Sequence, residues 1–399
     1  MSNPAPPAPA RLEALDVFRG ATVAAMLLVN DPGSWSHIYA PLRHAEWHGW
    51  TPTDLIFPFF LFIVGITTHL SLEGGRRRGA NDREMTVRII RRGAIIVLLG
   101  LLLNAFPFYT WGEVPGNPDP TFMERVVDRF QRMRFPGVLQ RIGVAYVAGA
   151  LLILRTTLRQ QIAITAALLL GYWAAMTLIP VPGTGQRGAT LLDQPGMVLS
   201  AWLDRQVFGP HLWVQSKTWD PEGLLSTIPA IGTVILGVLA GRLIGSGLPL
   251  RQRVGRLAMW GGAGIAAGLV WGMVFPINKP LWTSSYTLFT AGAGAVVLAL
   301  CLWAIEMRGS RWWTPPFVAY GVNPMIAFVG SGLMARLIYS LLKVQFEGRA
   351  VPLQAAIYRV AYEPWLPPEA ASLAFAISFV LVWLAILWPL WRRGLIFKV

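Results

Sequence analysis

The chain has 399 residues, of which 54% are hydrophobic and 14% charged, and its formal net charge is +14. This composition excludes an ordinary soluble domain, because such a domain cannot bury so many wholly apolar helices. The arginines stand in short clusters between apolar runs, which is how orientation in a bilayer is encoded, so nucleic acid is not expected as a partner.

Residues 1–10, MSNPAPPAPA, are rich in proline and alanine and are expected to form a disordered tail. They lack the basic start of a secretory signal peptide, and the first apolar run carries Asp16 and Arg19. We therefore expect this run to be kept as a membrane span, and residues 11–399 to form one transmembrane domain.

Ten apolar runs follow one another, several of them near the roughly 20 residues that cross a bilayer as a helix. All should be helices, because a backbone in lipid must satisfy its hydrogen bonds within the segment. The runs are 15–30, 54–72, 88–106, 137–154, 160–179, 224–244, 257–275, 284–306, 317–342 and 370–391. A kink is expected in the ninth at Pro324. The sequence thus predicts an all-α, polytopic membrane protein with about ten transmembrane helices.

Basic residues gather in the loops that follow even-numbered runs. They are Arg76, Arg77, Arg78, Arg83, Arg155, Arg159, Arg251, Arg253, Arg256, Arg308, Arg311, Arg392, Arg393 and Lys398. The positive-inside rule makes this side cytoplasmic and puts both termini there. Loops 30–54, 107–136 and 180–223 then face outward, although loop 107–136 also carries four arginines, which four acids offset.

The loop from Asn30 to Asp54 holds three of the five histidines and three tryptophans. His44 stands in RHAEWHGW beside Glu46, Trp47 and Trp50. An imidazole titrates near neutrality and suits a general base, while tryptophan faces suit the apolar side of a sugar ring. The alternative is an interfacial aromatic belt with surface histidines, and spacing alone does not separate the two.

Two further histidines of this loop, His37 and His48, fit the surface interpretation better. The histidine spacings of seven and four come without a helical frame, so no metal site is expected. The only cysteine, Cys301, lies inside an apolar run and excludes disulfides and thiolate metal sites within one chain.

The stretch TPTD opens the second run. Thr51 is a typical N-cap, Pro52 suits the first helical position, and a carboxylate at Asp54 favours the helix dipole. This structural account suffices for Asp54. The functional alternative is that Asp54 orients the histidine or receives charge from a substrate amine.

Other polar residues lie within or at the ends of the apolar runs. Asp16 and Arg19 share a helix face and can form an ion pair, or Arg19 can meet an anionic cofactor phosphate. Gln140 and Arg141 lie one turn inside the fourth run, where Arg141 either pairs with a buried acid or contacts a polar substrate. The glycines of 261–268 and 291–295 predict close helix packing.

Two later loops join charge to tryptophan on the outward side. These are WDPEG (219–223), with Asp220 and Glu222, and NKPLWTSSY (278–286), with Lys279 and Trp282. Together with the first loop they favour one polar vestibule that binds substrate.

Several segments resemble, in the same order, the heparan-α-glucosaminide N-acetyltransferase family, and more narrowly its bacterial NagX-like branch. They are LDVFRG (15–20), the asparagine that closes the first run, HAEWHGWTPTDLIFPFFLFIVG (44–65), PGVLQRIGVAY (136–146), DPEGLLSTI (220–228) and LWTSSY (281–286). The run from Trp47 to Gly65 is far more specific than any short motif.

The resemblance implies that acetyl passes from cytoplasmic acetyl-CoA to the amine of a terminal glucosamine across the bacterial inner membrane, without a metal. The family's active histidine corresponds to His44 and its catalytic asparagine to Asn30, while Asp54 and Arg141 fall on motif positions. His44 would act as base or carry the acetyl group, and Asn30 would donate to the oxyanion. The segment after Asn30 is longer than in the lysosomal enzyme, which leaves the glycan acceptor open.

Two other functions remain alternatives. One is an inner-membrane permease for N-acetylglucosamine or its oligomers, which should work without acetyl-CoA and tolerate His44→Ala. The other is a non-catalytic partner in an envelope assembly, which leaves the polar loops unexplained. The expected partners are acetyl-CoA, an amino-sugar or glycan acceptor and the lipid bilayer, with a homodimer as an open possibility.

Overall fold

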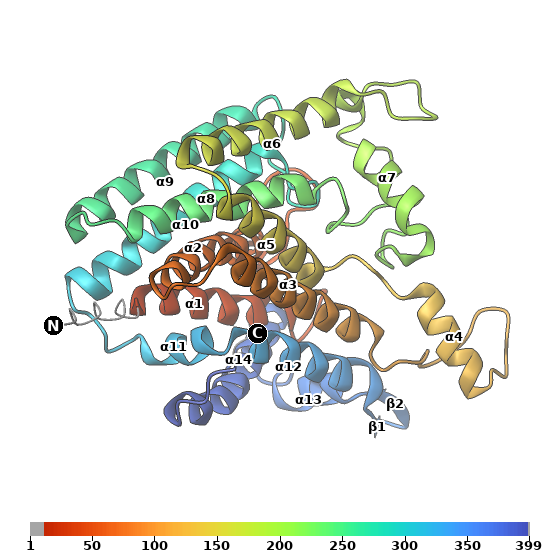
Figure 1. Cartoon of the computed structure of the whole chain (residues 1–399). Helices are drawn as coiled ribbons and strands as arrows, with labels where there is room; N and C mark the ends of the chain where they lie inside the picture. The colour runs from red at the N-terminus through yellow and green to blue at the C-terminus, as the bar shows by residue number, and fades with distance from the viewer. Residues whose placement is uncertain (1–11, 398–399) are drawn as a thin grey trace.

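A computed structural model of the chain describes residues 12–397, which fold into helices and one short hairpin (Figure 1). The predicted tail at 1–10 and Lys398 lie outside the described residues. The long helices are α1 (Glu13–Asn30), α2 (Ile56–Arg77), α3 (Asp82–Ala105), α5 (Val138–Leu154), α6 (Leu158–Leu178), α8 (Thr227–Ile244), α9 (Leu250–Gly272), α10 (Ser284–Cys301), α12 (Pro324–Arg336) and α14 (Pro368–Arg392). The shorter elements are α4 (Phe122–Arg132), α7 (Leu199–Phe208), α11 (Pro315–Val322), α13 (Leu353–Ala361), β1 (Lys343–Phe346) and β2 (Arg349–Pro352).

Each of the ten apolar runs lies on a helix, which confirms the predicted all-α fold. The ninth run is divided between α11 and α12 at Asn323, directly before Pro324, as the proline predicts. Six helical segments within residues 12–397 are long and apolar enough to cross a membrane, namely Pro52–Arg77, Leu158–Leu178, Thr227–Ile244, Ser284–Met307, Pro324–Leu341 and Pro368–Arg392. The count of ten spans and the cytoplasmic termini remain predictions.

The loops divide between the two ends of the bundle. In Figure 1, α4, α7 and the β1–β2 hairpin lie toward one end, whereas the first residues of α1 lie at the other. The turns that join α2 to α3, α5 to α6 and α8 to α9 are short, and arginines lie in them or on the helices beside them. Long and short connections therefore alternate from α1 to α9.

Glycines set the closest helix crossings. A Cβ on Gly65 of α2 would lie 2.0 Å from the carbonyl oxygen of Val234, and a Cβ on Gly237 of α8 would lie 2.1 Å from that of Phe62. Between α9 and α10, a Cβ on Gly292 would lie 2.6 Å from the carbonyl oxygen of Gly261. The predicted close packing of the glycine-rich stretches is confirmed, since no other residue allows such approach.

The loop between α1 and α2 is fixed at both of its ends. Gly33 donates its N–H to the carbonyl of Ser372 on α14 at 3.1 Å, and Gln354 of α13 donates to the carbonyl of Gly33. Further on, Gly49 donates to the carbonyl of Ile277 at 2.8 Å, and Asn278 donates to the carbonyl of Trp47 at 3.0 Å. The segment 273–283 between α9 and α10 thereby comes to lie against the residues around His44.

Candidate active site

The start of the second apolar run positions Asp54. Thr51 caps a short 3-10 helix, Pro52–Leu55, that leads into α2, and the Thr51 and Asp54 side chains form a reciprocal capping box. The Asp54 Oδ2 accepts the backbone N–H groups of Thr51 and Ala45, each at 3.0 Å. The predicted N-cap is confirmed, and it leaves Oδ1 of Asp54 turned toward the loop that carries His44.

His44 contacts this carboxylate directly. Its Nδ1 lies 2.7 Å from Asp54 Oδ1, while 49% of the imidazole side chain stays exposed and the carboxylate is only 1% exposed. An ionised carboxylate can only accept, so Nδ1 carries the proton and Nε2 is left as an acceptor. This is the orientation of a histidine that works as a general base.

Lys279 completes a three-residue cluster from segments far apart in the sequence. Its Nζ lies 3.0 Å from His44 Nδ1, 3.3 Å from His44 Nε2 and 3.4 Å from Asp54 Oδ1. Burial lowers the pKa of Lys279, although the carboxylates of Asp54 and Glu222 act in the opposite direction. The amine therefore loses its proton more readily than that of an ordinary lysine.

The cluster lines a cavity of about 530 Å³, which we call the outer cavity. Its polar lining consists of Asn30, His44, Glu46, Thr53, Asp54, Arg134, Glu222 and Lys279. Its aromatic lining includes Phe57, Phe60, Trp213, Trp219, Trp282 and Phe328. A cavity with a few convergent polar groups on an aromatic wall is what a small polar ligand with apolar faces requires.

A second cavity of about 460 Å³, the inner cavity, is lined by Arg19 and Asp16 of α1 and by Arg92 of α3. Phe60 and Phe328 line both cavities. Helix α1 runs along the two in turn, since Arg19 lines the inner cavity and Asn30 the outer one. Eleven residues of α-helix rise by about 16 Å, so the pair of cavities extends along much of the bundle.

Arg19 makes the intrahelical contact that its spacing predicts. Its Nη1 lies 3.3 Å from Asp16 Oδ1 and donates to the carbonyl of Gly321 at 2.8 Å. Arg19 nevertheless lines the inner cavity together with Arg92, so two guanidinium groups border that space. Both the ion pair and a place near an anionic ligand are compatible with this position.

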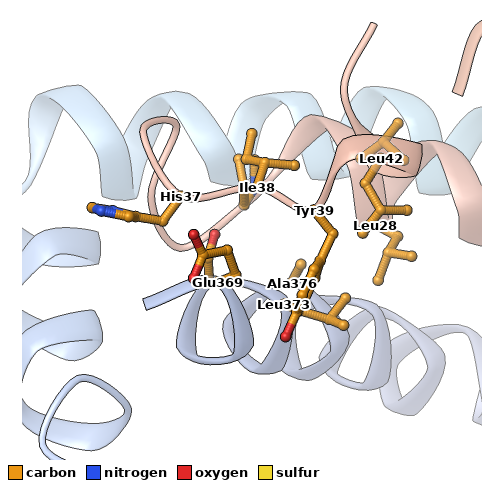
Figure 2. A pocket seen from close by; sticks show the side chains of 11 residues that line it. Leu28, His37, Ile38, Tyr39, Leu42, Glu369, Leu373 and Ala376 are labelled. Atoms are coloured by element: carbon orange, nitrogen blue, oxygen red, sulfur yellow. The ribbon is translucent and has the colours of Figure 1, made fainter. Parts of the chain in front are cut away.

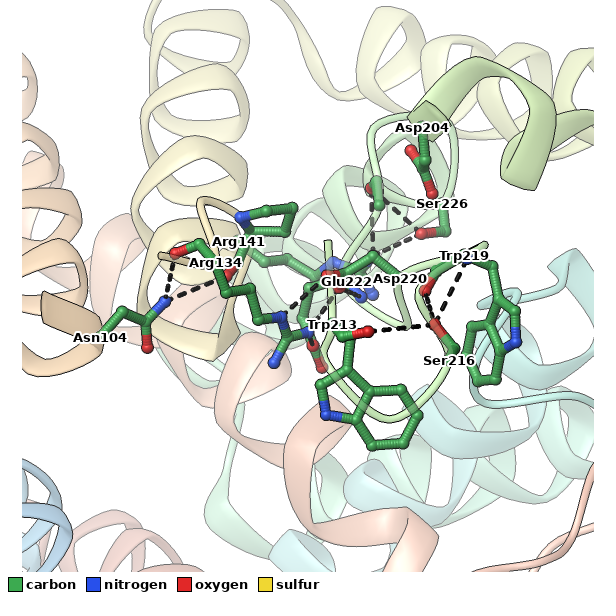
Figure 3. Close-up of polar contacts among 12 residues, drawn as sticks. Asn104, Arg134, Arg141, Asp204, Trp213, Ser216, Trp219, Asp220, Glu222 and Ser226 are labelled. Carbon is green, nitrogen blue, oxygen red and sulfur yellow. Dashed lines mark hydrogen bonds and ion pairs between the residues drawn. The ribbon is translucent and has the colours of Figure 1, made fainter. Parts of the chain in front are cut away.

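One wall of the outer cavity is an ion cluster that the sequence did not reveal. Arg134 donates to both oxygens of Asp220 and to Glu222, as Figure 3 shows. Burial disfavours the guanidinium, but the two carboxylates outweigh it and raise the pKa of Arg134. Asp220 is buried in this cluster and does not line the cavity, whereas Glu222 and Arg134 do.

Trp282 and Arg141 meet behind the cavity wall. Trp282 is fully buried, lines the outer cavity and donates its indole N–H to Thr233. The buried guanidinium of Arg141 lies 5.1 Å from the Trp282 ring centroid and donates to Ser226 and to the carbonyl of Gly223. Its hydrogen-bond partners are thus not acids, and Arg141 lines neither cavity.

Three other predicted site residues also lie away from both cavities. Trp47 donates its indole N–H to the carbonyl of Leu192 and packs its ring 5.4 Å from Trp219, a residue of the wall. Trp50 is 43% exposed and lies against Phe289. Gln140 is buried. Their substrate-binding roles remain predictions, and only Trp47 has an evident indirect route to the cavity.

The other histidines of the first loop are separate from His44. His37 borders a space of about 10 Å³ between this loop and α14, where Glu369 also lies, and this volume holds at most a water molecule (Figure 2). His48 contacts Asp193 at 2.9 Å and Asn278 at 3.2 Å. Within residues 12–397, no group of three or more His, Cys, Asp or Glu side chains is placed to hold a metal ion.

Comparison with known proteins identifies the family. The family model described as "Heparan-alpha-glucosaminide N-acetyltransferase, catalytic" matches residues 11–260. The chain belongs to this family. It is 29% identical over 373 residues to the heparan-alpha-glucosaminide N-acetyltransferase of Homo sapiens. This matched region covers 81% of this chain and 53% of the human protein. It is 27% identical over 366 residues to the Mus musculus protein of the same name, covering 80% of this chain and 53% of the mouse protein.

The chain therefore spans about half the length of the relatives it matches. The family match includes the whole loop with Asn30, His44 and Asp54 as well as the WDPEG loop. Lys279 and Trp282 lie beyond residue 260, so their part in the site rests on the geometry described above.

Proposed function

We propose that the chain is a multi-pass acetyltransferase of the bacterial inner membrane. It would move acetyl from cytoplasmic acetyl-CoA to the amine of a glucosamine-type sugar or glycan on the periplasmic side. The observation that carries the proposal is the pair of cavities, one bordered by arginines and one by His44, that share Phe60 and Phe328. The family supports the transfer chemistry.

The inner cavity suits the donor. Arg19 and Arg92 supply positive charge for the phosphates of CoA, while Val64, Ile96 and the shared phenylalanines supply apolar wall for the thioester arm. A thioester that passes Phe60 would then reach His44 from the side opposite to the acceptor.

The outer cavity suits the acceptor and the chemistry. With Nδ1 bound to Asp54, the Nε2 of His44 would take the proton of the attacking amine, or attack the thioester itself. Asn30 lines the same cavity and would donate its amide N–H to the developing oxyanion. Glu46 and Glu222 would accept from sugar hydroxyls or hold an ammonium, and Trp213 and Trp219 would face the sugar ring.

The test is an acetyl-transfer assay with the purified chain in lipid nanodiscs. Labelled acetyl-CoA and a panel of glucosamine-type acceptors should give labelled N-acetyl product, and His44→Ala should abolish it. His37→Ala is the matched control, because His37 borders a different, much smaller space and should keep the rate of the unaltered protein. Transfer by His44→Ala at that same rate would remove the imidazole from the mechanism.

The same two cavities could also serve a permease, so the assay needs a second arm. Proteoliposomes without acetyl-CoA should not accumulate N-acetylglucosamine or its oligomers. Uptake without acetyl-CoA that survives His44→Ala would favour the permease and refute the transferase.

A further inference from the structure

The amine of Lys279 lies where an acceptor amine has to be. Its Nζ is 3.0 Å from His44 Nδ1 and 3.3 Å from His44 Nε2, so it lies over the face of the imidazole, and it is 3.4 Å from Asp54 Oδ1. The amine is thus in contact with both an imidazole and a carboxylate, the groups that can take its proton. It is a primary amine, the same functional group as in the proposed acceptor.

The surroundings of Lys279 favour reactivity over a purely structural ion pair. A lysine attacks only when it is neutral, and burial lowers the pKa of Lys279. The ammonium form is retained by Asp54 at 3.4 Å, so the neutral form needs a base in contact to take its proton. His44 is that base, and both residues line the outer cavity beside Asn30.

Resting on the proposed function, we propose that Lys279 is a self-acetylation site: without an acceptor, Nζ takes the acetyl group of acetyl-CoA. The Nζ lone pair attacks the thioester carbonyl, a C–N bond forms, and the C–S bond breaks with its electron pair on sulfur. The proton passes from Nζ to His44 Nε2 and then to the CoA thiolate. The products are one amide on Lys279 and one free CoA thiol.

This modification would end the activity of the molecule that carries it. An amide does not return its acetyl group as a thioester or acyl-imidazole does, and acetyl-lysine has no charge to pair with Asp54. The acyl group would also occupy the space beside His44. An amino-sugar acceptor would protect the enzyme by taking the acetyl group first, so the site would sense the ratio of donor to acceptor.

The chain supplies its own controls for chemical acetylation. It has four lysines, at positions 217, 279, 343 and 398. Lys217 and Lys343 are exposed and line neither cavity, so they report reaction with acetyl-CoA that no base assists. Lys279 is the one lysine among residues 12–397 that contacts an imidazole.

The experiment incubates the full chain in nanodiscs with labelled acetyl-CoA, with and without glucosamine, and maps the label by peptide mass spectrometry. Label should accumulate on Lys279, roughly a hundredfold faster than in His44→Ala, since general-base catalysis is worth that much or more. It should resist hydroxylamine, which removes acetyl from histidine but not from lysine. Glucosamine should suppress it, and Lys279→Arg, which keeps the positive charge, should remove it.

Two results would overturn the inference and leave the proposed function in place. One is rapid acetylation of glucosamine when it is present, together with no label on Lys279 when glucosamine is left out. The other is label on Lys279 that equals that on Lys217 and Lys343 and persists in His44→Ala. Absence of both protein label and sugar product would instead refute the proposed function and the inference together.

Discussion

Replacing Asp54 by asparagine separates its two roles, because the side chain caps α2 and also orients His44. The carboxylate accepts from His44 Nδ1 at 2.7 Å, from two backbone N–H groups at 3.0 Å each and from Thr51 Oγ1 at 3.2 Å. An asparagine has only one acceptor oxygen. We expect this oxygen to take the place of Asp54 Oδ2 and keep the hydrogen bonds from the two backbone N–H groups. Its NH₂ group then faces His44, so Nδ1 must accept and Nε2 must carry the proton.

That tautomer cannot act as a base through Nε2. The corresponding substitution in serine proteases lowers kcat by about 10⁴. His44 is half exposed and so less firmly held here, and we expect a loss of about 10³ in kcat, roughly 4 kcal/mol of transition-state stabilisation. KM should change little, because the lost interaction matters in the transition state and less in the ground state.

The assay is steady-state acetyl transfer to glucosamine, combined with thermal unfolding in the same nanodiscs. Thr51→Ala is the control: it loses the hydrogen bonds to Asp54 and to the carbonyl of Arg43, yet leaves the carboxylate on His44. It should cost about 1 kcal/mol of stability, as an N-cap loss does, with kcat nearly unchanged. If Asp54→Asn lost stability but kept the kcat of the unaltered protein, the carboxylate would be a helix cap alone.

Four further predictions test other parts of the structure. Burial raises the pKa of Asp204 from 3.8 to about 6, so the folded state binds the proton more tightly than the unfolded state. The free energy of unfolding therefore falls as the pH rises between these two values. Asp204→Asn should raise the free energy of unfolding at pH 8 by up to about 3 kcal/mol, measured as a higher apparent Tm, with no gain below pH 4. Arg134→Met leaves two carboxylates without their cation and should cost about 3–5 kcal/mol, measured as a lower Tm, with recovery when both acids are also neutralised. Phe60→Trp should obstruct the passage between the cavities and lower kcat by about tenfold, and an unchanged rate would argue against that route. A cysteine at exposed Ser36 should react with an impermeant maleimide in intact cells, whereas one at exposed Gly247 should react only after permeabilisation, and the reverse would invert the topology.

Local sequence patterns sufficed for the helices and for the Asp54 cap. The ten apolar runs predicted the long helices, Pro324 marked the break between α11 and α12, and TPTD predicted the N-cap at Thr51. Each of these features depends on neighbours within a few residues, so one sequence contains the necessary information. The glycine stretches are of the same kind, since only small residues permit the crossing of α9 and α10.

The assembly of the site depends on contacts that no local pattern encodes. Lys279 lies 235 residues from His44, and Arg134 lies 86 residues from Asp220. The sequence marked Lys279 and Asp220 as polar residues beside tryptophans. It did not show that Lys279 contacts the imidazole of His44, or that Asp220 only supports the cavity wall through Arg134. Arg134 was counted among the basic residues of a long loop. Phe60 and Phe328 carried no signal, because a phenylalanine in an apolar helix is ordinary.

The arrangement of the two cavities also bears on where protons go in the proposed reaction. Phe60 and Phe328, where the cavities meet, offer no group that relays a proton, whereas His44 is half exposed in the outer cavity. An acceptor that arrives as an ammonium must release a proton in addition to the one that returns to the CoA thiolate. His44, half exposed and lining the outer cavity, is the group in contact with the acceptor site that could release this proton. In the proposed reaction one proton would therefore leave with CoA, and the second proton of an ammonium acceptor would stay on the acceptor's side.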